Sequence, residues 1–108
     1  MPALSIIIPV RNGGARLADC LAALVPGAVD GLLRQVIVVD GGSADASVGL
    51  ARDMGADVIE TEPGRGRQLA AGVSAAKHEW LLLLHADTVL EDRWVDAAHS
   101  HIRTHGQH

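Results

Sequence analysis

The 108-residue sequence contains no phenylalanine, no tyrosine and a single cysteine, and its acidic residues outnumber its basic ones. Trp80 and Trp94 are its only large aromatic residues, and the formal net charge is -4. The chain therefore lacks the aromatic platforms and the basic surface of nucleic-acid-binding proteins, and we expect no nucleic-acid partner. Cys20 has no second cysteine with which to form a disulfide, so nothing requires an oxidising compartment and a cytoplasmic location is the default expectation.

Long apolar runs are also lacking. The first apolar run ends at Pro9, too early for a signal peptide or a membrane span. We expect no transmembrane segment, while peripheral attachment to the inner membrane face through residues outside this chain stays open. Apolar residues nevertheless make up 48% of the chain and charged residues 20%, which is ordinary for a globular protein. We expect residues 1–108 to form a single domain around a buried core.

Short apolar segments alternate with segments of helical periodicity. We expect strands at 4–10, 35–40, 57–61 and 80–84. We expect helices from residue 15 to a stop at Pro26-Gly27, from an N-cap at Ser43 to Gly55, at 68–76 and at 92–103. The strands are apolar throughout, which is typical of a parallel sheet covered on both faces. The prediction is an α/β, Rossmann-like fold with strand order 3-2-1-4 and helices on both faces.

Two of these strands lead directly into an aspartate, Asp40 and Asp87. In open α/β sheets the ligand binds beyond the carboxyl ends of the strands, where the strand order reverses. We therefore expect a nucleotide pocket between residues 10–12 and 85–87, with Asp40 one strand away. Asp87 is a candidate ligand for Mg²⁺ or Mn²⁺, which prefer oxygen donors, or a turn residue before the last helix. Asp40 is a candidate ligand contact or the first residue of a local turn.

Basic residues and histidines supply further candidates. Arg65 and Arg67 stand just before a helix N-terminus, which favours an anion, although a solvated basic loop is the alternative. His85 lies at the pocket end of the fourth strand and either faces the ligand or is a core histidine. His101 and His105 are four residues apart, but no third ligand accompanies them, and we interpret them as exposed helix residues.

Three segments resemble the signatures of family 2 glycosyltransferases with the GT-A fold. They are SIIIPVRN at 5–12, VVDGGSAD at 38–45 and LHADT at 84–88. The segment EPGRGRQLAAG at 62–72, together with HADT at 85–88, is similar to the bacterial subgroup sometimes labelled selenodomain-associated transferases. The resemblance implies a metal-dependent, inverting transfer of a sugar from a nucleotide-diphosphate donor, with Mn²⁺ or Mg²⁺. It identifies neither the acceptor nor the oligomeric state.

The resemblance also implies roles for individual residues. The first strand end would line the nucleotide site, Asp40 would face the base or ribose, the two arginines would lie near the diphosphate, and Asp87 would bind the metal. With the residues of the expected crevice, the predicted donor-nucleotide site comprises Pro9, Val10, Asn12, Asp40, Arg65, Arg67, His85 and Ala86, and Asp87 is the predicted metal ligand.

The sequence departs from the family pattern at two positions. Gly41 stands where a second acid often follows Asp40, and His85 stands where the first acid of the DxD element is expected. The family's acceptor-binding half and its catalytic base lie beyond that element, whereas this sequence continues for one further helix. We therefore expect the donor-binding part of a glycosyltransferase, truncated before the acceptor-binding half.

Three other functions are weighed against this one. A nicotinamide- or flavin-binding domain needs G-x-G-x-x-G directly after the first strand, and residues 11–16 do not provide it. A nucleotidyltransferase of related architecture would carry a glycine-rich, arginine-containing loop there, where this chain has Pro9 and Asn12. A non-catalytic module that binds nucleotide sugars and relies on a partner for the acceptor side is the remaining alternative.

Overall fold

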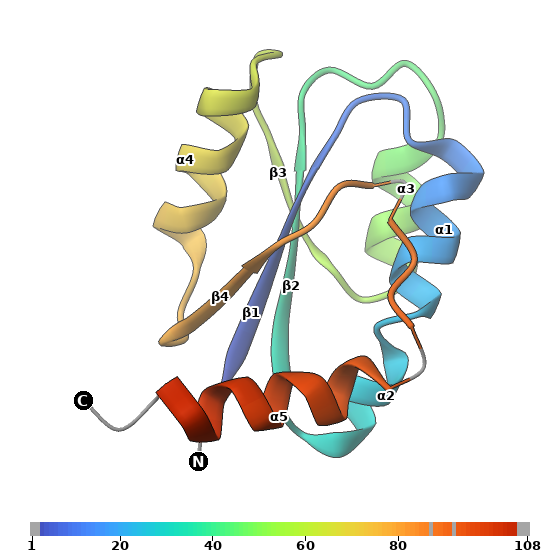
Figure 1. The fold of residues 1–108 in the computed structure, drawn as a ribbon. Coiled ribbons are helices and arrows are strands. Elements are labelled where there is room, and N and C mark those ends of the chain that lie inside the picture. The colour runs from blue at the N-terminus through green and yellow to red at the C-terminus, as the bar shows by residue number, and fades with distance from the viewer. Residues whose placement is uncertain (1–2, 87, 92, 106–108) are drawn as a thin grey trace.

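A computed structural model describes residues 3–86, 88–91 and 93–105 and shows an α/β fold (Figure 1). Four parallel strands form one sheet in the order β3-β2-β1-β4, which confirms the predicted fold class and strand order. The strands are β1 (Leu4–Val10), β2 (Leu33–Asp40), β3 (Asp57–Glu60) and β4 (Trp80–Leu83). The helices are α1 (Gly14–Ala22), α2 (Val25–Asp30), α3 (Ser47–Asp53), α4 (Arg65–Ala75) and α5 (Trp94–His105).

Helices cover both faces of the sheet, as predicted. Figure 1 shows α1 and α3 on one face, α4 on the other, and α5 running past α2 near the ends at which β1 and β2 begin. Alternate residues of β1 divide between the two layers: Ile6 and Ile8 pack toward α1, and Ile7 packs toward α4. All three are fully buried, so the central strand contributes its apolar residues to two cores at once.

The helix predicted to stop at Pro26-Gly27 is instead followed by α2, which contains both residues. Pro26 lies in the first turn, where a missing backbone N–H costs nothing. Gly27 is buried, and a Cβ added to it would lie 2.3 Å from the ring of Trp94, so the glycine makes room for a distant side chain. The indole Nε1 of Trp94 donates a hydrogen bond to the carbonyl of Ala23 (2.8 Å), which joins α5 to the end of α1.

Two predicted helix starts also differ from the structure. Ser43 is not an N-cap, because α3 begins at Ser47 and its N-cap residue is Ala46. The α4 helix begins at Arg65 and not at Gln68, so both candidate arginines lie in its first turn and not in the preceding loop.

Gln35, in β2, holds the end of α4 against the sheet. Its Oε1 accepts hydrogen bonds from the Ser5 hydroxyl (2.8 Å) and the backbone N–H of Lys77 (3.0 Å). Its Nε2 donates to Asp57 Oδ2 and to the carbonyl of Ala75, both at 3.2 Å. One buried amide therefore connects β1, β2, β3 and the last turn of α4.

Candidate functional site

A groove of about 280 Å³ opens where β1 and β4 end, beside the start of α4. A smaller hollow of about 90 Å³ shares Pro9, Arg65 and His85 with it and extends toward Leu83 and Leu84. This is the place where the reversal of strand order predicts a crevice. The groove is lined by Pro9, Val10, Arg11, Arg65, Gln68 and His85.

A further cavity of about 250 Å³ lies at the opposite end of the sheet, among residues of α2, the end of α3 and the start of β2. Its polar side chains are already engaged: Gln35 donates to Asp57, and Arg34 Nε donates to the carbonyl of Gly31 (2.9 Å). The groove at the carboxyl ends, which brings cationic and polar groups together from three elements, is the stronger candidate.

The floor and one wall of the groove come from β1. Pro9 is half-buried and lines both hollows, whereas Val10 is 2% exposed and contributes mainly backbone. The carbonyl of Val10 accepts hydrogen bonds from the backbone N–H of Gly41 (2.8 Å) and from Nε2 of Gln68 (3.0 Å). These bonds fix the end of β1 relative to β2 and α4.

Arg65 and His85 meet across the groove. Nη2 of Arg65 lies 2.7 Å from Nε2 and 3.2 Å from Nδ1 of the imidazole. A guanidinium has only donors, so the imidazole nitrogen that it meets acts as an acceptor. Both side chains are exposed, and they come from the first turn of α4 and from the residues just after β4. The structure thus joins two predicted site residues that are 20 positions apart in the sequence.

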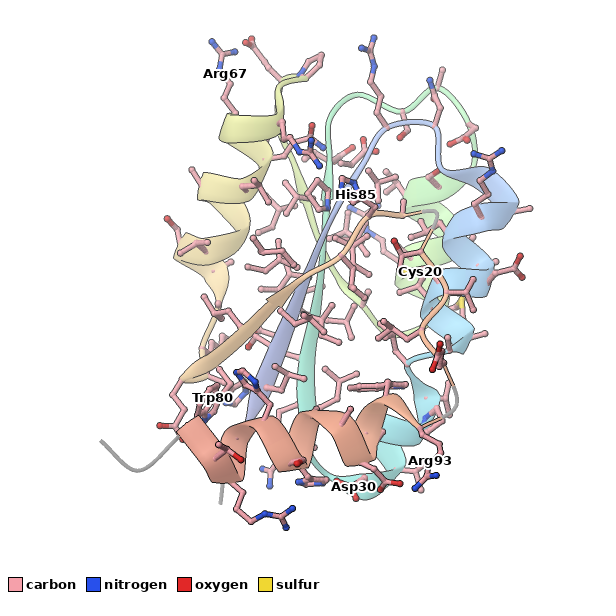
Figure 2. All side chains as sticks on the ribbon, viewed as in Figure 1. Cys20, Asp30, Arg67, Trp80, His85 and Arg93 are labelled. Atoms are coloured by element: carbon pink, nitrogen blue, oxygen red, sulfur yellow. The ribbon has the colours of Figure 1, made fainter. Side chains whose placement is uncertain are left out.

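Arg67 takes a different direction. Its Nη1 forms a salt bridge with Glu62 Oε2 (2.7 Å), both side chains are largely exposed, and Arg67 does not line the groove. Figure 2 shows Arg67 at the outer end of α4, pointing away from His85. The two arginines of the motif are therefore not equivalent.

Asp40, at the end of β2, is 3% exposed. It is the first residue of a local turn, which is one of the two roles that the sequence predicts for it. Its Oδ2 accepts hydrogen bonds from the backbone N–H groups of Gly42 (3.2 Å) and Ser43 (3.1 Å). Among the described residues, Asp40 Oδ1 is the only side-chain polar atom that is sealed from solvent and has no hydrogen-bond partner. The turn uses only Oδ2, and a ligand contact at Asp40 stays a prediction.

Asn12 joins the loops that follow β1 and β2. Its φ of 56° is left-handed, a conformation that asparagine tolerates better than most residues. Its backbone N–H donates to Ser43 Oγ (2.8 Å), and its Oδ1 accepts from the backbone N–H of Ala44 (2.7 Å). The amide oxygen of Asn12 is therefore occupied within the protein, and its proposed nucleotide contact stays a prediction.

Asp45, in the loop that follows β2, has a pKa below its usual value. Hydrogen bonds from the hydroxyl and the backbone N–H of Ser47 lower the pKa of Asp45, because they favour its ionised form. Ser47 Oγ in turn accepts from the backbone N–H of Gly14 (3.0 Å), so this cluster ties the start of α1 to the start of α3.

Gln68 is the groove residue that sequence reasoning did not single out. It is 7% exposed, and its Nε2 donates to the carbonyls of Val10 (3.0 Å) and Val39 (2.9 Å). A Cβ added to Gly41 would lie 2.8 Å from its carboxamide. The only sequence signal was Gly41 itself, a glycine where the family pattern often has an acid.

The remaining predicted positions do not add to the groove. Ala86 is half-buried, packs against the core cluster that contains Leu17 and Val10, and does not line the groove. Asp87, the predicted metal ligand, lies outside the described residues. Among residues 3–86, 88–91 and 93–105, no three His, Cys, Asp or Glu side chains are close enough together to hold a metal ion.

None of the helices in the described part of the chain is both long and apolar enough to span a bilayer. His101, on α5, is exposed, as expected, and its ring meets that of Trp80 edge-on at 6.3 Å between centroids.

Comparison with known proteins gives a consistent result. A family model described as glycosyl transferase family 2 matches residues 5–107. A crystal structure of residues 1–349 of TarS from S. aureus has a TM-score of 0.82 at 21% identity and covers 96% of this chain and 33% of that chain. A crystal structure of a mycobacterial protein has a TM-score of 0.81 at 22% identity and covers 95% of this chain and 37% of that chain.

A third structure was solved with ligands. Glucosyl-3-phosphoglycerate synthase from Mycobacterium tuberculosis, in complex with Mn²⁺, uridine diphosphate and glucosyl-3-phosphoglycerate, has a TM-score of 0.76 at 25% identity. That match covers 88% of this chain and 37% of the synthase. The chain therefore has the GT-A, Rossmann-like fold and spans between 33% and 37% of the length of these three structures.

Proposed function

Because the chain belongs to glycosyl transferase family 2, we propose that it forms the donor-nucleotide-binding part of an enzyme that moves a sugar from a nucleotide diphosphate to an acceptor. The resemblance of residues 62–72 supports assignment to the selenodomain-associated subgroup, and family membership supports transfer with inversion. A cytoplasmic location, with or without peripheral attachment through residues outside this chain, belongs to the same proposal.

The observation that carries the proposal is the position of Arg65. It lies in the first turn of α4, beside His85 and at the edge of the groove where β1 and β4 end. The first backbone N–H groups of a helix have no partners within the helix and carry partial positive charge. A guanidinium at the same place adds a planar set of donors that matches phosphate oxygens. The diphosphate of the donor would bind here.

The chemistry of the site follows from this placement. Transfer of the sugar leaves negative charge on the departing diphosphate, and a fixed cation next to it stabilises that charge as it develops. Pro9 offers an apolar surface on the other side of the groove, so the base and ribose would lie toward the ends of β1 and β2. No described residue is assigned as the base that deprotonates the acceptor.

A divalent cation, Mn²⁺ or Mg²⁺, is part of the proposal through Asp87, on the family motif and on the Mn²⁺ present in the synthase structure. When bound, the cation would neutralise charge on the departing diphosphate. The test is Asp87→Ala: binding of a nucleotide sugar should lose its dependence on Mn²⁺. An unchanged dependence would contradict the assignment.

The proposed function is tested by titrating the protein with UDP- and GDP-sugars in the presence and absence of Mn²⁺, followed by a donor hydrolysis assay. We expect saturable binding of at least one nucleotide sugar. Binding without turnover would identify a nucleotide-sugar-binding module that depends on another segment or partner for the acceptor side. Failure of every nucleotide sugar to bind with metal present would refute both functions.

A further inference from the structure

Gln68 lies one helical turn after Arg65, on the same face of α4 and at the inner end of the groove. A helical turn advances about 5 Å along the helix axis. A ligand whose diphosphate lies at Arg65 can therefore reach Gln68 and the end of β1 with its nucleoside part, because all three line the same groove. This step rests on the proposed function, because it takes the ligand to be a nucleotide.

The carboxamide of Gln68 is held in one orientation. Its Nε2 lies 3.0 Å from the carbonyl of Val10 and 2.9 Å from the carbonyl of Val39. Two carbonyl acceptors require the NH₂ group at this position and exclude the flipped amide. Both hydrogens of Nε2 are thereby used within the protein, and Gln68 can offer a ligand only the acceptor Oε1.

Oε1 has no hydrogen-bond partner among the described residues, although the Gln68 residue as a whole is 7% exposed. Solvent still reaches Oε1. In the described part of the chain, the only side-chain polar atom that has neither solvent contact nor a hydrogen-bond partner is Asp40 Oδ1. Gln68 also lines the groove. A nearly buried carbonyl oxygen that solvent still reaches is an acceptor that a ligand donor can complete.

Gly41 is what allows this arrangement. A Cβ added there would lie 2.8 Å from both Cδ and Oε1 of Gln68 and 2.9 Å from Nε2. No side chain fits at position 41 unless the carboxamide leaves its place. The glycine and the glutamine therefore act as a pair, in which the absence of one side chain positions the other.

We propose that Oε1 of Gln68 selects the base of the donor nucleotide by accepting a hydrogen bond from a ring N–H, and that the base is uracil. Uracil carries such an N–H at N3 and guanine carries one at N1, and the uridine diphosphate in the synthase structure of similar fold favours uracil over guanine. Cytosine has a lone pair at N3 and adenine has one at N1, and either would face the oxygen of Gln68 as a second acceptor. A site that leaves a buried acceptor unpaired discriminates strongly against the ligand that cannot donate to it.

The test compares ligands that differ at this one atom. Wild-type protein is titrated calorimetrically with UDP, with UDP methylated at N3, with CDP and with GDP, each with Mn²⁺ present. We expect UDP to bind at least about tenfold more tightly than the methylated analogue and CDP. Equal affinity for UDP, N3-methylated UDP and CDP would overturn the role of Gln68, and tighter binding of GDP than of UDP would overturn the choice of uracil.

Two variants link the preference to the structure. Gly41→Ala displaces the carboxamide and should reduce the ratio of the UDP and N3-methyl-UDP affinities to about one, as should Gln68→Met. Gly49→Ala is the matched control, because that glycine is exposed on α3 and an added Cβ would meet nothing within 4 Å. The control should keep the wild-type ratio. An unchanged ratio in folded Gly41→Ala protein would contradict the inference.

The outcomes also separate this inference from the proposed function. If no nucleotide diphosphate binds wild-type protein, the proposed function fails and the role of Gln68 fails with it. If UDP binds but N3 methylation has no effect, only the role of Gln68 fails.

Discussion

Nη2 of Arg65 lies 2.7 Å from Nε2 of His85, so the first turn of α4 and the segment that follows β4 are joined across the groove by a cation and an imidazole. The imidazole holds the guanidinium at the mouth of the groove while leaving most of its donors unused. The contact also places His85 beside a positive charge at the position where the family pattern has an acid.

Removing the Arg65 cation should weaken donor binding. For Arg65→Gln we expect the Kd for UDP to rise about tenfold or more, since a hydrogen bond to a charged group contributes about 1.5–3 kcal/mol. The remaining affinity should also depend less steeply on salt concentration. Arg103→Gln, an exposed arginine on α5, is the matched control. Equal effects of the two substitutions in calorimetric titrations would show that Arg65 acts only through net charge.

The contact between α4 and the sheet should not tolerate a larger residue at Gly72. A Cβ there would lie 2.4 Å from Cγ2 of Ile7 and 3.2 Å from Cγ2 of Val39, both in fully buried side chains. Overpacking of this kind costs about 1–3 kcal/mol, and we expect Gly72→Ala to lower the free energy of unfolding by that amount in urea titrations. Gly49→Ala, on the exposed side of α3, should be neutral or stabilising by up to about 1 kcal/mol. A Gly72→Ala protein as stable as wild type would contradict the close packing of α4.

Trp94 should be the more important of the two tryptophans for stability. It is 8% exposed, it packs against Gly27, and its Nε1 donates to the carbonyl of Ala23. Trp94→Ala should cost about 3–5 kcal/mol and Trp94→Phe should cost less, because the smaller ring still fills part of the site. Trp80→Phe, at the half-buried edge of the sheet, should cost less than either. Unfolding in urea, followed by circular dichroism, ranks the three variants.

The lowered pKa of Asp45 predicts that the stability of the folded protein depends on pH. Its pKa lies below the ordinary value of 3.8 because the hydroxyl and backbone N–H of Ser47 donate to the ionised carboxylate. The folded protein therefore favours the ionised carboxylate, which adds to the free energy of unfolding. This stabilisation is fully present above the pKa of Asp45 in the unfolded chain, and it is lost as the pH falls through the pKa in the folded protein, which lies below 3.8. Asp45→Asn should be less stable than wild type at neutral pH, and the difference should shrink as the pH falls below 3.8.

Urea unfolding midpoints measured at neutral pH and below 3.8 test this expectation. Asp19→Asn serves as the control, because Asp19 is exposed on α1. A constant difference between wild type and Asp45→Asn across this range would contradict the link between the Ser47 hydrogen bonds and stability.

The sequence predicted the fold correctly where the local pattern of apolar residues matched the way in which the strands and helices pack. The apolar strands and their alternation with helices predicted the parallel sheet, and the common topology of such folds predicted its order. The errors arose where a local signal has two meanings or a distant residue uses it. Pro26 is as compatible with the first turn of a new helix as with a helix stop, Gly27 makes room for Trp94, and the Ser43 hydroxyl accepts from the backbone N–H of Asn12.

The same distinction applies to the site. The meeting of Arg65 and His85 follows from topology, because parallel strand ends and the helix that precedes β4 converge at one edge of the sheet. Gln68 could not be found in this way. A polar residue near the start of a helix is usually solvated, and only the carbonyls of Val10 and Val39, which accept hydrogen bonds from its Nε2, explain why this one turns inward.

The two buried glutamines have a joint consequence for motion. Gln68 fastens the first turn of α4 to the ends of β1 and β2, and Gln35 fastens its last turn to their beginnings. A helix tied at both ends cannot swing away from the sheet without breaking buried amide hydrogen bonds. In native-state hydrogen exchange, the amides of α4 should therefore open together with those of β1 and β2 as one cooperative unit, whereas a helix held only by apolar contacts could open on its own.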